Sequence, residues 1–180
     1  MPLSTLNSLN AKAVDADAPR LSFVREPRTI NLDISEIEMD KVTLPIHPEH
    51  PDKGVREWPL GDSSLKVKIA LEDFTTREAR RLKDFADIGI NNEKTMEGWI
   101  GEIIRTERVD NTPIIHWLPS NMAQPAVLLL EEGGELVTAF GLLETNDYPV
   151  GTVVQLERMG FAILEGTEDD GARRLVRLHG

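Results

Sequence analysis

The sequence predicts an all-β fold of mostly antiparallel strands, arranged as barrels or as a sandwich. Short runs in which polar and apolar residues alternate recur along the chain, as they do in half-buried strands. Glycine, proline, asparagine and aspartate separate these runs at short intervals, which is typical of barrels and sandwiches. The 180 residues, 40% of them hydrophobic, are enough for one domain or two small ones.

The N-terminal segment has a different pattern from the rest. Leu3, Leu6, Leu9 and Ala13 recur at a spacing of three or four residues, which predicts a short amphipathic helix over residues 1–18. No basic leader followed by an apolar stretch is found there, so a signal peptide is not predicted. No apolar run approaches the roughly 20 residues that span a bilayer. We therefore expect a cytoplasmic protein without a membrane partner.

The remainder of the chain reads as strands separated by turns, without an evident repeat. Gly133-Gly134 lies between two of the runs and predicts a two-residue hairpin turn. Residues 71–90 leave two alternatives open, a turn of helix beginning near Asp73 or a strand over residues 81–90. The predicted strands are residues 29–34, 41–46, 65–71, 112–118, 126–131, 135–140, 152–158, 160–164 and 174–178.

The charge is acidic overall but unevenly distributed. A net charge of -11 disfavours general nucleic-acid binding, because phosphate contacts need lysine and arginine. Residues 64–83, however, contain six basic and three acidic residues, and residues 172–180 contain three arginines and no acid. Two interpretations stay open: a local RNA-binding patch, or basic residues scattered over solvated strands.

The sequence contains no familiar catalytic or metal-binding pattern. With no cysteine, it excludes disulfides, thiolate zinc sites and cysteine nucleophiles. Glycine-rich phosphate loops, the nucleophile elbow and the zinc-protease motif are also absent. His47 and His50 are three residues apart, but the prolines beside them forbid a helix, so we expect a stiff turn. His116 beside Trp117 is typical of a packed histidine. We expect no catalytic residue and no metal site in this chain.

Six short phrases, in order from residue 6 to residue 161, resemble one known family. They resemble the C-terminal region of class I glutamyl- and glutaminyl-tRNA synthetases. The phrases are LNSLN at 6–10 with APRLSFV at 18–24, PIHPEHP at 45–51, GVR at 54–56, RLKDF at 81–85, IIHWLP at 114–119 and GTVVQLERMGF at 151–161.

The resemblance implies two antiparallel β-barrels, proximal and distal, with the distal barrel formed by an excursion of the chain. We expect the N-terminal helical segment at residues 1–18, at the junction with a missing catalytic domain, and the double barrel over residues 19–180. The excursion is expected within about residues 71–150. The stretch between His116 and Gln155 is shorter than in glutaminyl enzymes, which favours an archaeal-type glutamyl enzyme.

The resemblance also implies a function, recognition of the tRNA anticodon. The parent enzyme would be a glutamate–tRNA ligase, and ATP and Mg²⁺ would bind in its catalytic domain, whose His-Ile-Gly-His and Lys-Met-Ser-Lys-Ser signatures are absent here. Whether the chain is an enzyme stays open. Three origins of the chain also stay open: an expressed domain, a truncated gene product or a free-standing paralogue. Glutamate tRNA is the expected partner, with glutamine tRNA as a further candidate.

Five residues match family positions that contact the anticodon. Arg20, Gln155 and Arg158 match positions at the middle and third bases, and Arg81 and Lys83 match positions at the first base. Glutamine offers a donor and an acceptor to uracil, and arginine offers a fork of donors to a base or a phosphate. Gln155 and Arg158 would point to opposite faces of a continuous strand unless a bulge or strand end intervenes.

Three other hypotheses remain. In the first, the barrels form a non-catalytic protein-interaction module that docks a partner synthetase or adaptor. In the second, they form a small barrel enzyme that uses Glu or Asp. The five residues are alternatively plain surface charge on a barrel. Whether glutamate tRNA alone or both tRNA species are accepted is also open.

Overall fold

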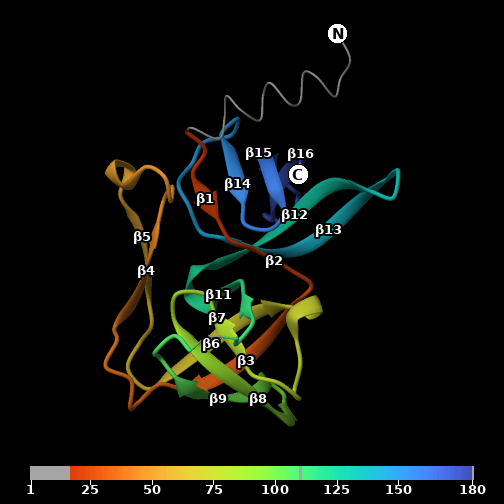
Figure 1. Cartoon of the computed structure of the whole chain (residues 1–180). Coiled ribbons are helices and arrows are strands. Elements are labelled where there is room, and N and C mark those ends of the chain that lie inside the picture. The colour runs from red at the N-terminus through yellow and green to blue at the C-terminus, as the bar shows by residue number, and fades with distance from the viewer. Residues whose placement is uncertain (1–16, 110, 180) are drawn as a thin grey trace. The chain divides into compact units, whose positions relative to one another are not determined.

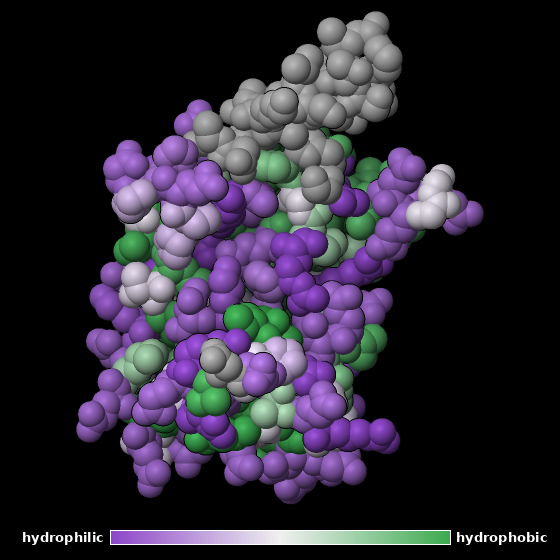
Figure 2. All heavy atoms as spheres, viewed as in Figure 1, coloured by the Kyte–Doolittle hydropathy of each residue, from purple (hydrophilic) through white to green (hydrophobic). Residues whose placement is uncertain are grey.

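The computed structural model describes residues 17–109 and 111–179 (Figure 1). These residues form strands and short 3-10 helices, which confirms the all-β prediction. The helix predicted over residues 1–18 lies outside the described residues, apart from its last two positions. Hydrophilic residues cover most of the face seen in Figure 2, as the alternating pattern of half-buried strands requires.

The described residues divide into two compact units. The first unit contains the described part of Met1–Phe23, with Pro45–Val55 and Gln124–Gly180, and the second contains Val24–Leu44 and Arg56–Ala123. The excursion predicted within about residues 71–150 shares residues 71–123 with the second unit.

The first unit is built on a seven-stranded sheet that is nearly closed into a barrel. Its edge strands, β1 and β2, are consecutive in the chain and separated only by Ser22. The backbone N–H of Ser22 donates to Glu144 Oε1 (3.1 Å), and the N–H of Glu144 donates to the Ser22 carbonyl (2.9 Å). A single bridging segment therefore joins the two ends of the sheet. In sheet order the strands are β1 (Arg20–Leu21), β14 (Val153–Leu156), β15 (Gly160–Thr167), β16 (Arg173–His179), β12 (Ala123–Glu132), β13 (Glu135–Glu144) and β2 (Phe23–Arg25).

The second unit closes its own seven-stranded sheet in the same manner. The edge strands are again consecutive in the chain, and only His116 separates them. A two-stranded ribbon of β4 (Lys41–Pro45) and β5 (Val55–Pro59) extends from the connection between two strands of this sheet. In sheet order the strands are β10 (Ile114–Ile115), β7 (Arg80–Leu82), β8 (Ala86–Thr95), β9 (Gly98–Arg105), β3 (Pro27–Asp33), β6 (Ser64–Ala70) and β11 (Trp117–Pro119).

The two sheets share one topology, although the sequence shows no repeat. The short closing strand lies parallel to the first strand of a hairpin in both, β1 beside β14 and β10 beside β7. The second strand of each hairpin neighbours a further strand, β16 in one sheet and β9 in the other. That strand in turn pairs in parallel with the next one, β12 or β3. The closing segment precedes the other strands of the first sheet but follows those of the second. The two sheets are therefore related by circular permutation.

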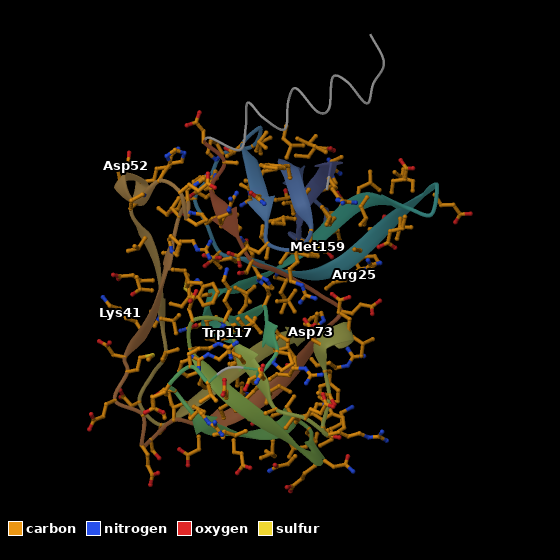
Figure 3. All side chains as sticks on the ribbon, in the orientation of Figure 1. Arg25, Lys41, Asp52, Asp73, Trp117 and Met159 are labelled. Carbon is orange, nitrogen blue, oxygen red and sulfur yellow. The ribbon has the colours of Figure 1, made fainter. Side chains whose placement is uncertain are left out.

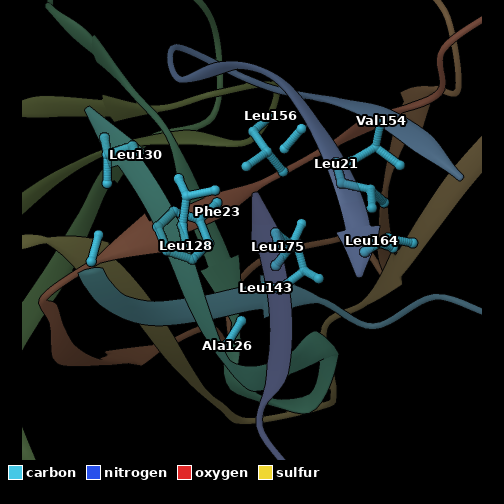
Figure 4. Packing of buried hydrophobic residues seen from close by; sticks show 12 residues of the cluster. Leu21, Phe23, Ala126, Leu128, Leu130, Leu143, Val154, Leu156, Leu164 and Leu175 are labelled. Carbon is cyan, nitrogen blue, oxygen red and sulfur yellow. The ribbon is translucent and has the colours of Figure 1, made fainter. Parts of the chain in front are cut away.

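Each unit has its own apolar core. In the second unit, Trp117 stacks on Phe85 and meets Trp58 edge-on, with ring centroids 5.3 and 5.2 Å apart. Trp117 is labelled in Figure 3. In the first unit, leucines from six strands pack with Phe23 and Val154 inside the barrel (Figure 4). Because burial at roughly 25 cal/mol per Å² of apolar surface drives folding, these clusters hold the sheets closed.

Most predicted strands are confirmed, and the differences arise where turns interrupt them. Gly133 and Gly134, with φ of +58° and +82°, join β12 to β13 in the predicted hairpin. Residues 71–90 contain a short 3-10 helix, η2 (Leu71–Asp73), followed by β7 and β8. The strand predicted over residues 112–118 is broken at His116, where the sheet closes. The remaining 3-10 helices are η1 (Pro51–Lys53) and η3 (Ser120–Met122).

The histidine-containing turn has the stiff geometry expected from its prolines. His47 is fully buried, and its Nδ1 accepts a hydrogen bond from the N–H of Glu49 (3.2 Å). The N–H of His50 donates to the His47 carbonyl (3.1 Å), and the two rings lie 4.5 Å apart. Within residues 17–109 and 111–179, no group of three or more potential metal ligands lies together.

Candidate nucleic-acid interface

The structure brings Arg20 and Gln155 together in the first unit. They are register partners in the parallel pair of β1 and β14, followed by the partners Leu21 and Leu156. Both leucines are buried in the barrel core, at 2% and 0% exposure. Since side chains alternate between the faces of a sheet, Arg20 and Gln155 share the opposite face, away from the core. Both are partly exposed there.

Backbone hydrogen bonds fix this pair from both sides. The N–H of Gln155 donates to the Pro19 carbonyl (2.9 Å), and the N–H of Glu157 donates to the Leu21 carbonyl (3.1 Å). On the other side of β1, the N–H of Arg20 donates to the Ile46 carbonyl (2.8 Å). The two side chains therefore start from a well-defined backbone.

The Gln155 side chain retains an acceptor without a partner among the described residues. Its Oε1 atom is buried, and none of these residues donates a hydrogen bond to it. An unsatisfied buried acceptor costs about 1–3 kcal/mol. A buried acceptor of this kind calls for an explanation, and a donor supplied by a ligand is one.

Arg158 lies beyond the end of β14, so strand alternation does not apply to it. It is exposed, has a left-handed backbone (φ +69°), and lies in the three-residue turn that joins β14 to β15. The N–H of Met159 closes this turn by donating to the Leu156 carbonyl (3.0 Å). The strand end that the sequence argument required is therefore present.

The C-terminal arginines have contacts within the protein. Arg177 Nε donates to the Met159 carbonyl (2.7 Å) and so supports the turn that carries Arg158. Arg174 lies 3.1 Å from Glu165 and 3.7 Å from Glu168. The basic stretch over residues 172–180 thus serves the first unit's own structure to a large extent. Sequence reasoning missed this role because the partners come from other strands.

Arg81 and Lys83 lie on one side of the segment that begins with β7. Their N–H groups donate to the carbonyls of Pro113 (2.7 Å) and Ile115 (3.1 Å), and Leu82 between them is fully buried. Arg81 is itself buried, with 9% of its side chain exposed, and its guanidinium lies 3.4 Å from the Asp87 carboxylate. Lys83 is half-buried, and its carbonyl accepts a hydrogen bond from Trp117 Nε1 (2.9 Å).

One candidate residue from each unit occupies an equivalent place in the two sheets. Gln155 and Arg81 each lie on the strand beside the parallel closing strand. Arg158 and Asp84 are each the exposed, left-handed residue of the following three-residue turn, with φ of +69° and +62°. Gln155 and Arg81 are the only such pair among the five candidates, because Asp84, the counterpart of Arg158, is not a candidate.

Other basic residues of the second unit are partly neutralised. Lys66 lies 3.7 Å from Glu97, and Arg80 lies 3.1 Å from Glu78. Burial, and then repulsion from Lys66, lower the pKa of Lys68, whose Nζ donates to Thr29 Oγ1 (2.6 Å). The local excess of positive charge over residues 64–83 is therefore weaker than a count of residues suggests.

No helix among the described residues is long and apolar enough to cross a bilayer.

Comparison with known proteins identifies a family. Residues 18–109 match the model of the family described as tRNA synthetases class I (E and Q), anti-codon binding domain. The chain is also similar to curated glutamate–tRNA ligases of archaea. It is 29% identical to that of Pyrococcus furiosus over 178 residues, which cover 92% of this chain and 29% of the relative.

Other relatives give the same result. The glutamate–tRNA ligase of Thermoplasma volcanium is 32% identical over 86% of this chain and 26% of its own length, and that of Caldivirga maquilingensis is 26% identical over 98% and 31%. The chain thus spans less than a third of these relatives. The family model covers half of the chain, in the segment that contains Arg20, Arg81 and Lys83. The chain therefore belongs to the family of anticodon-binding domains of class I tRNA synthetases for glutamate and glutamine.

Proposed function

We propose that this chain recognises the anticodon of tRNA, as the anticodon-binding region of a glutamate–tRNA ligase. The family match and the similarity to archaeal glutamate–tRNA ligases support this proposal. The observation that carries it is the parallel pair of Arg20 and Gln155, whose side chains share the face opposite the core.

The chemistry of this pair suits an unstacked base of an RNA loop. Such a base exposes its Watson–Crick edge, which carries both donors and acceptors. Gln155 Oε1 is an acceptor for which a base N–H supplies the missing donor. Arg20 offers donors on the same face, and Arg158 offers a further fork from the exposed turn. We assign the middle and third anticodon bases to these three residues.

In the second unit, we assign the first anticodon base to Arg81 and Lys83. Arginine presents paired donors in a fixed plane, which suits a base edge. Lysine carries a point charge without such a fork, so Lys83 is assigned to the phosphate backbone near that base. The two residues lie on one side of the same short segment.

The activity of the parent protein is part of the proposal. Glutamate would be joined to tRNA with ATP and Mg²⁺ bound by a catalytic domain, and the residues described here would only select the tRNA. Acceptance of glutamine tRNA, docking of a partner synthetase and a cytoplasmic location stay predictions from the sequence.

Salt-titrated binding tests this proposal directly. The chain is titrated against a tRNA with the glutamate anticodon and against the same tRNA with its middle base changed. We expect the changed base to weaken binding by on the order of tenfold or more, because one wrong base typically costs about 1–3 kcal/mol. Equal weak binding to both tRNAs, or none to either, contradicts anticodon recognition and favours the protein-docking hypothesis.

A further inference from the structure

Three charged side chains form a row across β7, β8 and β9 of the second unit. Arg81 is the register partner of Asp87, and Asp87 is the register partner of Arg105. Arg81 Nη1 lies 3.4 Å from Asp87 Oδ1, and Arg105 Nε lies 3.8 Å from Oδ2. One carboxylate is thus shared by two guanidinium groups, and the row has one surplus positive charge.

The connection between β9 and β10 covers this row. Thr112 Oγ1 donates to Asp87 Oδ2 (3.3 Å), and the Glu107 carbonyl accepts a hydrogen bond from Arg81 Nη1 (3.3 Å). Asp87 is almost completely buried, with 2% of its side chain exposed. The hydroxyl of Thr112 and the guanidinium of Arg81 therefore fix the orientation of the carboxylate.

The side-chain hydrogen bonds of Arg81 all use one nitrogen of its guanidinium. Both of the hydrogen bonds that its side chain donates to described residues, to Asp87 and to Glu107, use Nη1. Neither bond uses Nε or Nη2, which form the other edge of the guanidinium. Arg105, in contrast, has 42% of its side chain exposed and lies beyond hydrogen-bond distance of Asp87.

Stability alone is a weak reason for this arrangement. The desolvation of buried ions offsets most of their attraction, so a buried ion pair is often no more stabilising than apolar residues of the same volume. A fixed carboxylate does, however, restrict the rotamers of an arginine whose fork must match a base edge within a small angle.

We propose that Asp87, with Thr112 behind it, is a positioning residue that orients Arg81 for recognition of the first anticodon base. This proposal rests on the proposed function, and specifically on the assignment of Arg81 to that base. Asp87 contacts no RNA in this account: it acts through the guanidinium of Arg81. Its effect is confined to the base that Arg81 contacts, and discrimination at the middle base depends on the first unit.

A matched pair of substitutions at Thr112 tests the proposal without removing a buried charge. Thr112→Val removes the hydroxyl at nearly the same volume, whereas Thr112→Ser keeps the hydroxyl that donates to Asp87. Asp87→Asn is the stronger variant, and Glu93→Gln, an exposed carboxylate on β8, is its control. Folding of each variant is checked by urea unfolding. Binding is measured to tRNA with the glutamate anticodon, to the same tRNA with its first base changed, and to one with its middle base changed.

We expect Asp87→Asn to reduce discrimination at the first base about tenfold, since a correctly placed arginine fork is worth about that much in base selection. Thr112→Val should reduce it by a smaller factor, and Thr112→Ser and Glu93→Gln should leave it unchanged. Discrimination at the middle base should be the same in all variants, which a general loss of structure would not preserve.

Two results overturn the proposal and are distinguishable. If the wild-type chain discriminates at the first base, and both Thr112→Val and Asp87→Asn do so equally well, Asp87 has only a structural role. If the wild-type chain ignores the first and middle bases alike, the proposed function itself fails. Should Asp87→Asn not fold, the contrast between Thr112→Val and Thr112→Ser gives the answer.

Discussion

At the scale of single residues, close backbone approach explains one glycine of the second unit. Gly101 on β9 is buried, and a Cβ atom there would lie 2.7 Å from Ile30 Cγ2 and 3.0 Å from the Gly89 carbonyl oxygen. Such contacts are shorter than side-chain packing allows. Gly89 on the neighbouring strand has room, since its Cβ would meet only Ile104 Cδ1, at 3.7 Å.

We therefore expect Gly101→Ala to lower the free energy of unfolding by about 1–3 kcal/mol, the usual cost of overpacking a core. The matched control, Gly89→Ala, should change it by no more than about 0.5 kcal/mol, in keeping with substitutions that create no clash. Urea unfolding of both variants measures the difference. Equal effects of the two substitutions would mean that β9 does not approach β3 as closely as described.

Residues that need tertiary neighbours were the hardest to place from the sequence. Arg20, Gln155, Arg81, Lys83 and Arg158 were selected by resemblance, and only Gln155 and Arg81 lie at equivalent places on the two sheets. Their partners had no sequence signal. Strand register brings Asp87 to Arg81 within the local hairpin of β7 and β8. It brings Glu144 to Ser22 from a segment far away in the chain.

At the scale of elements, each barrel depends on one bridging segment. Ser22 joins the two edges of the first sheet, and it is 1% exposed. Its N–H donates to the buried carboxylate of Glu144, and its hydroxyl lies 3.4 Å from Glu157 Oε2. Removing the acceptor would leave a buried N–H without its partner, which carries a large desolvation cost.

Glu144→Ala should accordingly destabilise the first unit by about 1–3 kcal/mol. Glu144→Gln keeps an oxygen acceptor at the same place and should cost less. Glu131→Ala, at an exposed carboxylate on β12, is the control and should change stability by no more than about 0.5 kcal/mol. Denaturant unfolding, followed by far-ultraviolet circular dichroism, measures the stability of all three variants. Equal stability of Glu144→Ala and Glu131→Ala would contradict this account of barrel closure.

The elements were largely predictable because strand alternation is a local property. The runs over residues 29–34 and 65–71 became β3 and β6 with few changes. The breaks at Ser22 and His116 were not predictable, because a residue between two edge strands has the same local pattern as a continuous strand. The break between the predicted strands 152–158 and 160–164 is confirmed, but the turn begins two residues earlier than predicted and so includes Arg158.

At the scale of the whole molecule, two sheets of one topology each present one candidate residue, Gln155 or Arg81, at the same structural position. The hairpins are β14–β15 and β7–β8, and the closing strands are β1 and β10. Because the closing segment comes first in one sheet and last in the other, the similarity cannot appear as a simple period in the sequence. Equivalent residues also differ in type, as Gln155 and Arg81 do.

The acidic composition is also a property of the whole molecule, and it affects how the chain binds RNA. A chain with a net charge of -11 repels RNA over much of its surface, so binding must depend on local contacts and fall with added salt. Specificity therefore rests on base contacts rather than on bulk charge. Affinity without a catalytic domain is expected to be low, because acceptor-stem contacts would come from that domain.

The most direct test of the central claim is the ratio of affinities for tRNA with the glutamate anticodon and tRNA with its middle base changed. It is measured for the wild type, Arg20→Ala, Gln155→Ala and Lys66→Ala. We predict that Arg20→Ala and Gln155→Ala reduce the ratio about tenfold, as loss of a base contact does, whereas Lys66→Ala leaves it intact. An unchanged ratio in both Arg20→Ala and Gln155→Ala would contradict the assignment of these residues to the anticodon.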